Sequence, residues 1–285
     1  MSTITIIGGG NMGEALIKGL RRAHRVSVFE INTARARYLK KKYKVSIKGD
    51  IHRALDGANV VIFAVKPQDM AVLLAEICRG TACRARTEQL FISIAAGLTT
   101  KFFEKHLGKV RVVRAMPNMP ALIGEGMTAL CAGQHALSKD LAVARKILSS
   151  IGKTMVVKEK YMDAVTAVSG SGPAYVFLFV EQWMAAAKAL GFKDAQARTL
   201  VYQTLTGSVH LLVGAGPCAR PHMDGPCVRP PMDAATLRAK VTSKGGTTQA
   251  AMDVFTQSKF GTIFKQAITA AKKKARKLAI SYLRA

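Results

Sequence analysis

The residue pattern with the clearest chemical meaning is GGGNMG at residues 8–13, which satisfies G-x-G-x-x-G. It follows an apolar run directly and opens an amphipathic stretch, so it lies between an expected strand and an expected helix. Glycines let the chain turn tightly and let backbone amides approach a pyrophosphate, and a helix N-terminus adds partial positive charge. The pattern therefore predicts a dinucleotide-binding site.

Glu30 lies 17 residues after Gly13, at the end of the next expected strand. A carboxylate in this place commonly accepts a hydrogen bond from the adenosine ribose and repels a 2′-phosphate, which favours NADH. Asn32, Thr33 and Arg35 follow at once and could hold that phosphate, so NADPH stays an open alternative. The purely structural interpretation of Glu30 is an exposed strand end.

A second glycine pair at residues 245–246 precedes an apolar helical run that begins with Thr247 and Thr248. Free backbone amides in the first turn of a helix suit a carboxylate. The structural interpretation of Thr248 is a helix-start hydroxyl, but its place beside two glycines favours contact with a ligand. For Ser171, which precedes Pro173 and another long apolar stretch, helix capping is favoured over catalysis.

Short apolar strands and amphipathic helices alternate through the first part of the chain. Strands are expected at residues 4–8, 26–30, 60–65, 90–93 and 110–116, and helices at 12–23, 33–43, 68–77 and 100–107. The strands are continuously apolar, as is usual for strands buried on both faces of a parallel sheet. The alternation predicts an α/β Rossmann-type doubly wound sheet over residues 1–160.

Beyond residue 160 only helices are expected. They are placed at residues 173–190, 193–213, 234–241, 247–256 and 262–282. Their apolar surface exceeds what a lone small domain covers, which predicts a C-terminal all-helical substrate-binding and dimerisation domain over residues 161–285. The most apolar window, residues 175–192, contains Glu181, Gln182 and Lys188, which favours a buried helix over a membrane span.

Composition narrows the possible partners and the compartment. The 285-residue chain carries a formal net charge of +26. Its basic residues are spread out, with clusters only at residues 40–44 and 272–277 and no alternating aromatics, which favours a solvated surface over a dedicated nucleic-acid interface. The five scattered cysteines and the absence of a signal-peptide pattern predict a reducing, cytoplasmic compartment.

Residues 216–224 and 225–233 form a tandem repeat, GPCARPHMD followed by GPCVRPPMD. Its density of proline excludes helix and predicts a surface excursion between two helices. Cys218, His222 and Cys227 fit no common zinc spacing, and duplication explains them more simply, so no metal site is predicted.

Five further blocks occur in order: AVKPQ at 64–68, SIAAG at 93–97, RAMPNMPA at 114–121, SGSGPAY at 169–175 and VTSKGGTT at 241–248. With the glycine loop, in this order and spacing, the chain resembles the Δ1-pyrroline-5-carboxylate reductase family from residue 4 to about residue 280. The resemblance implies an oxidoreductase that reduces Δ1-pyrroline-5-carboxylate to L-proline, the last step of proline biosynthesis, with NADPH or NADH. It also implies a homodimer, often assembled into larger rings.

The resemblance also implies roles for individual residues. The expected cofactor contacts are Gly8, Gly10, Asn11 and Met12 at the pyrophosphate, and Ala64, Lys66 and Pro67 at the ribose and nicotinamide. Glu30 and Asn32, expected at the adenosine end, come from their position after the glycine loop and not from the resemblance. The expected substrate contacts are Ser243, Gly246, Thr247 and Thr248, around the carboxylate and the ring nitrogen. Thr248 is the expected catalytic residue, because its hydroxyl would orient that nitrogen.

Three places depart from the family pattern. Met119 stands where threonine is usual, and Lys244 stands where proline is frequent, so a positive charge could lie near the substrate carboxylate or point into solvent. Residues 215–216 replace an acidic residue followed by proline, so a contact from that loop is not expected.

Two other functions compete with this interpretation. A β-hydroxyacid-dehydrogenase-like enzyme needs a proton-transferring lysine near the domain junction, and residues 163–191 offer only Lys188, well past the glycine-rich start. A nucleotide-binding regulatory protein that uses its basic surface on nucleic acid would not require the block at residues 241–248.

Overall fold

The computed structural model describes residues 1–79, 88–214, 230 and 232–284. These form two compact units, Met1–Pro173 with Ile268–Ala285, and Ala174–Ala267. The domain boundary expected at residue 160 stays a prediction. Most of the tandem repeat lies outside the described residues, so the expectation that it is a surface excursion stays a prediction.

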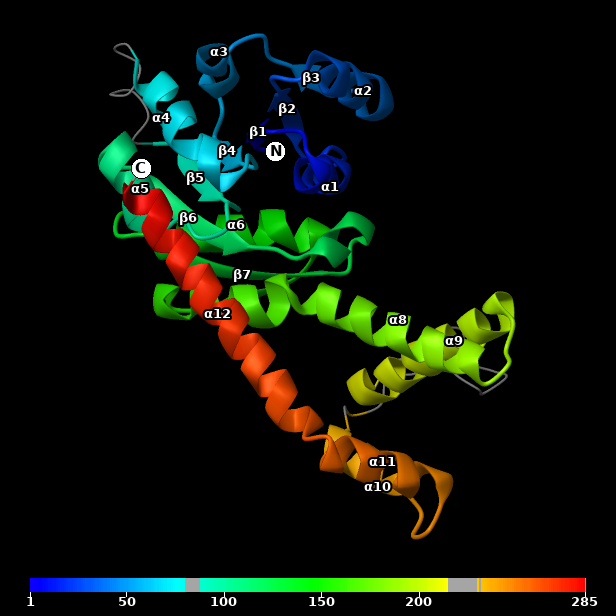
Figure 1. The fold of residues 1–285 in the computed structure, drawn as a ribbon. Coiled ribbons are helices and arrows are strands. Elements are labelled where there is room, and N and C mark those ends of the chain that lie inside the picture. The colour runs from blue at the N-terminus through cyan, green and yellow to red at the C-terminus, as the bar shows by residue number, and fades with distance from the viewer. Residues whose placement is uncertain (80–87, 215–229, 231, 285) are drawn as a thin grey trace. The chain divides into compact units, whose positions relative to one another are not determined.

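The larger unit is built on an eight-stranded sheet in the order β3-β2-β1-β4-β5-β6-β7-β8 (Figure 1). The strands are β1 (Thr3–Ile7), β2 (Arg25–Phe29), β3 (Ser46–Ile47), β4 (Val60–Phe63), β5 (Leu90–Ser93), β6 (Arg111–Met116), β7 (Gly126–Ala132) and β8 (Gly152–Val156). The order of the first six strands is that of the Rossmann fold. The doubly wound expectation is therefore confirmed.

The sheet is mixed, however, where a parallel one was expected. Strand β7 runs antiparallel to β6, while the other neighbouring strands pair in parallel. The reason is the connection, residues 117–125, because a parallel crossover needs about a dozen or more residues.

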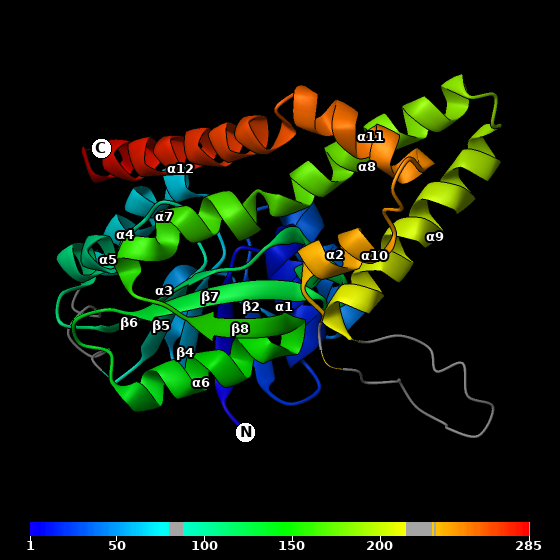
Figure 2. The same ribbon diagram turned by 90° about the horizontal axis from the view of Figure 1, so that it is seen from below.

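Helices cover both faces of this sheet. On one face lie α1 (Asn11–Leu20), α2 (Thr33–Tyr43) and α6 (Ser138–Leu148), and on the other lie α3 (Ile51–Leu55), α4 (Met70–Cys78) and α5 (Thr100–Leu107). Figure 2 shows α6 opposite α4 and α5 across the strands. Phe63 stacks on Phe91 and on Phe103, with ring centroids 5.7 and 5.6 Å apart, so aromatic packing holds α5 to the sheet.

An uninterrupted run of helical backbone leads from the sheet into the second unit. A 3-10 turn (Glu159–Tyr161) is followed by α7 (Met162–Val165), by a π-helical segment (Thr166–Gly170) and by α8 (Gly172–Ala189). Ser171 has helical angles (φ −85°, ψ −17°), and its N–H donates to the Thr166 carbonyl oxygen at 2.8 Å. A helix N-cap has non-helical angles, so the expectation that Ser171 caps α8 is wrong.

The stretch Glu159–Ala189 is long and apolar enough to cross a membrane by length and composition, with a mean hydropathy of 1.2 over its window. Only 6% of that window is buried within the chain, and Val176, Phe177 and Leu178 are exposed. In the single chain this helix is therefore exposed, where a buried helix was expected.

The second unit has no strand among its described residues, as expected. Its helices are the main part of α8, then α9 (Asp194–Val213), α10 (Ala234–Lys240), α11 (Thr247–Gln257) and the beginning of α12 (Phe260–Arg284).

Candidate active site

The glycine loop joins β1 to α1 with very little space for side chains. Gly8 has a φ of +100°, and its N–H donates to the Phe29 carbonyl oxygen at 2.8 Å. A Cβ at Gly8 would lie 2.7 Å from the Ala64 carbonyl oxygen, and one at Gly13 would lie 2.1 Å from the Gly8 carbonyl oxygen. Both positions therefore require glycine for backbone reasons.

The N-terminus of α1 is open to a ligand. Gly10 is its N-cap and provides no side-chain cap, and a Cβ placed there would meet no atom within 4 Å. The amides of Asn11 and Met12 lie in the first turn, where α-helical amides have no acceptor within the helix. The loop thus offers free donors, positive helix-end potential and room, which fits the pyrophosphate of a dinucleotide.

The residues after β4 lie at the same edge of the sheet. Strand β4 pairs in parallel with β1, and the Ala64 N–H donates to the Ile7 carbonyl oxygen at 2.8 Å. The chain leaves β1 toward β2 and leaves β4 toward β5, so the strand order reverses between them, where open α/β sheets bind ligands. The structure therefore brings Lys66 and Pro67 to the same end of the sheet as the glycine loop.

Glu30 faces the glycine loop and is not a free strand end. Its carboxylate accepts the Gly9 N–H at 2.7 Å and the Asn32 N–H at 2.8 Å. Asn32 caps α2, because its side-chain oxygen accepts the Arg35 N–H at 2.9 Å. Both predicted adenosine-side residues thus hold the turn that borders the loop.

A cluster around Glu14 adjoins the loop and was not predicted from the sequence. The Glu14 carboxylate accepts hydrogen bonds from Arg35 at 2.5 Å, Lys42 at 3.0 Å and Tyr43 at 2.6 Å. Burial by itself would raise the pKa of Glu14, but the hydrogen bonds from Tyr43, Lys42 and Arg35 outweigh it and lower the pKa to about 2. Glu14 is therefore an anion that anchors the start of α1 to α2.

Two of the motif blocks meet beyond β6. The Asn118 side-chain amide donates to the Ser169 carbonyl oxygen at 3.2 Å and to its hydroxyl at 3.3 Å, while its own oxygen accepts the Met127 N–H at 2.8 Å. A Cβ at Gly170 would lie 2.7 Å from the Met116 methyl carbon. Asn118 therefore fastens the π-helical segment to the end of β6, and π-helical segments frequently mark functional sites.

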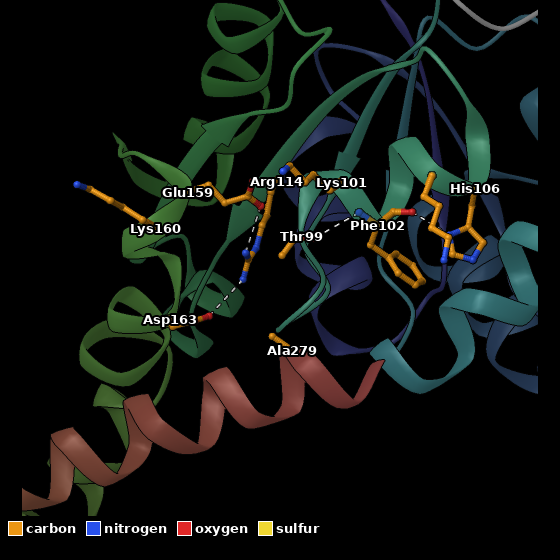
Figure 3. Close-up of a pocket in the computed structure, with 10 residues that line it drawn as sticks. Thr99, Lys101, Phe102, His106, Arg114, Glu159, Lys160, Asp163 and Ala279 are labelled. Atoms are coloured by element: carbon orange, nitrogen blue, oxygen red, sulfur yellow. Dashed lines mark hydrogen bonds and ion pairs between the residues drawn. The ribbon is translucent and has the colours of Figure 1, made fainter. Parts of the chain in front are cut away.

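A separate pocket of about 580 Å³ lies beside the buried Arg114, and Figure 3 shows this residue between Glu159 and Asp163. Arg114 contacts Glu159 at 3.3 Å and Asp163 at 3.9 Å. The two Glu159 oxygens also accept the Thr100 N–H and hydroxyl, both at 2.8 Å. No predicted site residue is among the described residues that line this pocket. Glu159 therefore neutralises a buried cation and caps α5, which is a structural role.

The predicted substrate block opens α11 in the second unit. Gly245 has a φ of +71°, and Gly246 is the N-cap, with its N–H donating to the Ser243 carbonyl oxygen at 3.0 Å. A Cβ at Gly246 would lie 2.4 Å from the Ser243 hydroxyl oxygen. Thr247 and Thr248 are the first two helical residues, so the local geometry of a helix start with free amides is as expected.

Among the described residues, no group of three or more His, Cys, Asp or Glu side chains is placed to hold a metal ion. Cys218, His222 and Cys227 lie outside that part of the chain.

Comparison with known proteins covers both units. Residues 3–97 match the family model described as NADP oxidoreductase, coenzyme F420-dependent, and residues 159–278 match pyrroline-5-carboxylate reductase dimerisation. A pyrroline-5-carboxylate reductase of Mycobacterium tuberculosis is 38% identical over 99% of this chain and 98% of its own. One from Synechocystis is 35% identical over 96% and 97%.

Solved structures agree. A pyrroline-5-carboxylate reductase from Coxiella burnetii has a TM-score of 0.83 and 32% identity, covering 97% of this chain and 98% of its own. A pyrroline carboxylate reductase from Plasmodium falciparum, solved with NADP bound, has a TM-score of 0.80 and 26% identity, covering 98% of both chains.

The dimerisation match over residues 159–278, which include the exposed apolar stretch Glu159–Ala189, supports a homo-oligomer. The chain has the dinucleotide loop and the helical second unit, and it is similar to pyrroline-5-carboxylate reductases along nearly its whole length. These observations all indicate the same family. The chain belongs to the pyrroline-5-carboxylate reductase family.

Proposed function

We propose that this chain reduces Δ1-pyrroline-5-carboxylate to L-proline by hydride transfer from NADPH or NADH. The proposal depends on family membership together with one observation. Two helices of this chain have glycine as their N-cap residue: α1, which follows β1, and α11. The first suits the pyrophosphate of the cofactor, and the second suits the carboxylate of the substrate.

The cofactor contacts are proposed at the end of the sheet that carries the glycine loop. Gly8 and Gly10 allow close approach, and the amides of Asn11 and Met12 receive the pyrophosphate. Ala64, Lys66 and Pro67 border the ribose and nicotinamide, while Glu30 and Asn32 border the adenosine end. When bound, NAD(P)H supplies the hydride.

The substrate contacts are proposed at the start of α11. The amides of Gly246 and Thr247 and the hydroxyl of Ser243 receive the carboxylate, and the Thr248 hydroxyl orients the ring nitrogen. A cyclic imine that is already protonated is strongly electrophilic at carbon, so no powerful protein acid is required. The work of these residues is positioning, which can lower a barrier by roughly 7–11 kcal/mol at the upper end.

A steady-state assay tests the function directly. Purified protein should oxidise NADPH or NADH when Δ1-pyrroline-5-carboxylate is added and should form proline, whereas β-hydroxyacids with the oxidised cofactors should give no turnover. Absence of turnover with either reduced cofactor in a folded, oligomeric sample would overturn the proposal.

We propose a homodimer as the minimal assembly, formed through the exposed apolar faces of α8 and α9, in the cytoplasm and without a dedicated nucleic-acid or membrane partner. The support is the exposure of Phe177, Phe179 and Leu200 in the single chain, within the region that matches dimerisation. Light scattering coupled to gel filtration measures the assembly.

Thr248→Ala should slow catalysis about tenfold to a hundredfold and leave cofactor affinity unchanged. Loss of a hydrogen bond to a charged group costs about 1.5–3 kcal/mol, which gives this range of rates. Thr256→Ala is the matched control, because Thr256 lies on the same helix and its hydroxyl donates to the Met252 carbonyl oxygen at 2.8 Å. Equal kinetics in both variants would remove Thr248 from the site.

A further inference from the structure

We infer that Arg35 is a positioning residue for the dinucleotide loop: with Glu30 it holds both backbone polar groups of Gly9, and so it orients the amides that receive the pyrophosphate. The inference deepens the cofactor site and rests on the proposed function for the identity of the dinucleotide.

The contacts on Gly9 come from two oppositely charged side chains. The Glu30 carboxylate accepts the Gly9 N–H at 2.7 Å, and the Arg35 Nε donates to the Gly9 carbonyl oxygen at 2.6 Å. Both are charge-assisted hydrogen bonds, which are roughly twice as strong as neutral ones. Glu30 directly follows β2 and Arg35 lies in the first turn of α2, so the end of β2 and the start of α2 together hold the loop.

Planarity of the peptide bond transmits this hold to the ligand side. The carbonyl of Gly9 and the N–H of Gly10 belong to one trans peptide, in which they point in opposite directions. A carbonyl fixed on Arg35 therefore directs the Gly10 N–H away from Arg35. Since Gly10 also caps α1, the same peptide sets the direction in which the chain enters the helix.

Three successive glycines need such a hold. Glycine loses more conformational freedom on ordering than any other residue, so residues 8–10 would otherwise lose that freedom when the cofactor binds. Donors that are already ordered bind a ligand more tightly, because binding then does not have to order them. The effect of the hold should therefore be seen in affinity for any dinucleotide.

Arg35 is itself fixed in place. The Arg35 Nη2 atom contacts the Glu14 carboxylate at 2.5 Å. The guanidinium carbon of Arg35 lies 5.0 Å from the centre of the Tyr38 ring. Glu14 also receives Lys42 and Tyr43, and it lies in the first turn of α1. The guanidinium thus joins the loop, α1 and α2. The competing role of Arg35 is that of a direct ligand of a 2′-phosphate.

The test is the affinity of Arg35→Met for NADH and for NADPH, measured by fluorescence titration without substrate. We expect both dissociation constants to rise by a similar factor, about tenfold to a hundredfold, because the glycines of the loop must then be ordered when the cofactor binds. At saturating cofactor, kcat and the KM for Δ1-pyrroline-5-carboxylate should stay within about twofold of wild type. Arg37→Met removes the same charge from an exposed position of the same helix and should change neither affinity more than about twofold.

Three outcomes would overturn the inference. A loss confined to NADPH would make Arg35 a 2′-phosphate ligand, equal losses in the Arg35 and Arg37 variants would assign the effect to net charge, and unchanged affinities would show that the loop orders itself. If Arg35→Met does not fold, Arg35→Lys serves instead, since one ammonium replaces the planar fork and should weaken both cofactors partly and equally. Binding is measured without turnover, so an inactive wild type that still binds dinucleotides would contradict only the proposed substrate.

Discussion

Gly13→Ala should destabilise the protein and abolish cofactor binding. The added Cβ would lie 2.1 Å from the Gly8 carbonyl oxygen, a backbone atom that cannot rotate away. Gly8 is held by its hydrogen bond to Phe29 and by its close approach to Ala64, so α1 must move away from β1. Overpacking of this kind costs about 1–3 kcal/mol, occasionally more, and the backbone clash places this variant at the upper end.

Thermal unfolding with and without NADPH measures both effects. We expect Tm to fall by about 6–12 °C and the stabilisation by NADPH to disappear. Gly10→Ala is the control for stability, because the Cβ there meets no atom within 4 Å and its φ of −62° suits any residue. If the two variants have the same Tm, the spacing between α1 and β1 is not what requires glycine at position 13.

The sequence predicted elements whose pattern is local. The apolar runs that became β1, β2, β4, β5 and β6 are rich in Val, Ile and Phe, and the glycine loop stands between a strand and a helix, as its motif requires. Strands β7 and β8 were not predicted, because GMTALCA and GKTMV each begin with glycine and together contain one Val and no Ile or Phe. Their place in the sheet comes from pairing with neighbouring strands.

The parts of the site that could not be predicted join distant positions. Arg35 contacts Glu14 across 21 residues, and Asn118 contacts Ser169 across 51 residues. Spacing reveals a motif when its residues share one turn or one helix face, but these pairs meet only once the sheet has formed. The error at Ser171 has a related cause: a serine before Gly-Pro matches a capping pattern, and only the backbone shows that the helix passes through it.

Glu14→Gln should remove a large, pH-dependent part of the free energy of unfolding. The pKa of Glu14 is about 2 in the folded protein, against an ordinary value of 4.5. A lowered pKa means that the folded state prefers the ionised form, so the stabilisation is full above about pH 5 and is lost as the pH falls toward 2. The shift corresponds to about 3 kcal/mol at neutral pH.

The measurement is urea unfolding of wild type and variant from pH 7 to pH 3 at one protein concentration, since an oligomer's stability depends on concentration. The difference between the two proteins should be constant from pH 7 to about pH 5 and should shrink below that. Glu125→Gln is the control, because it removes an exposed carboxylate outside the cluster. A Glu14 difference that persists unchanged at pH 3 would show that the glutamine disturbs packing between α1 and α2. In that case the charge on Glu14 would not be what holds Arg35 beside the loop.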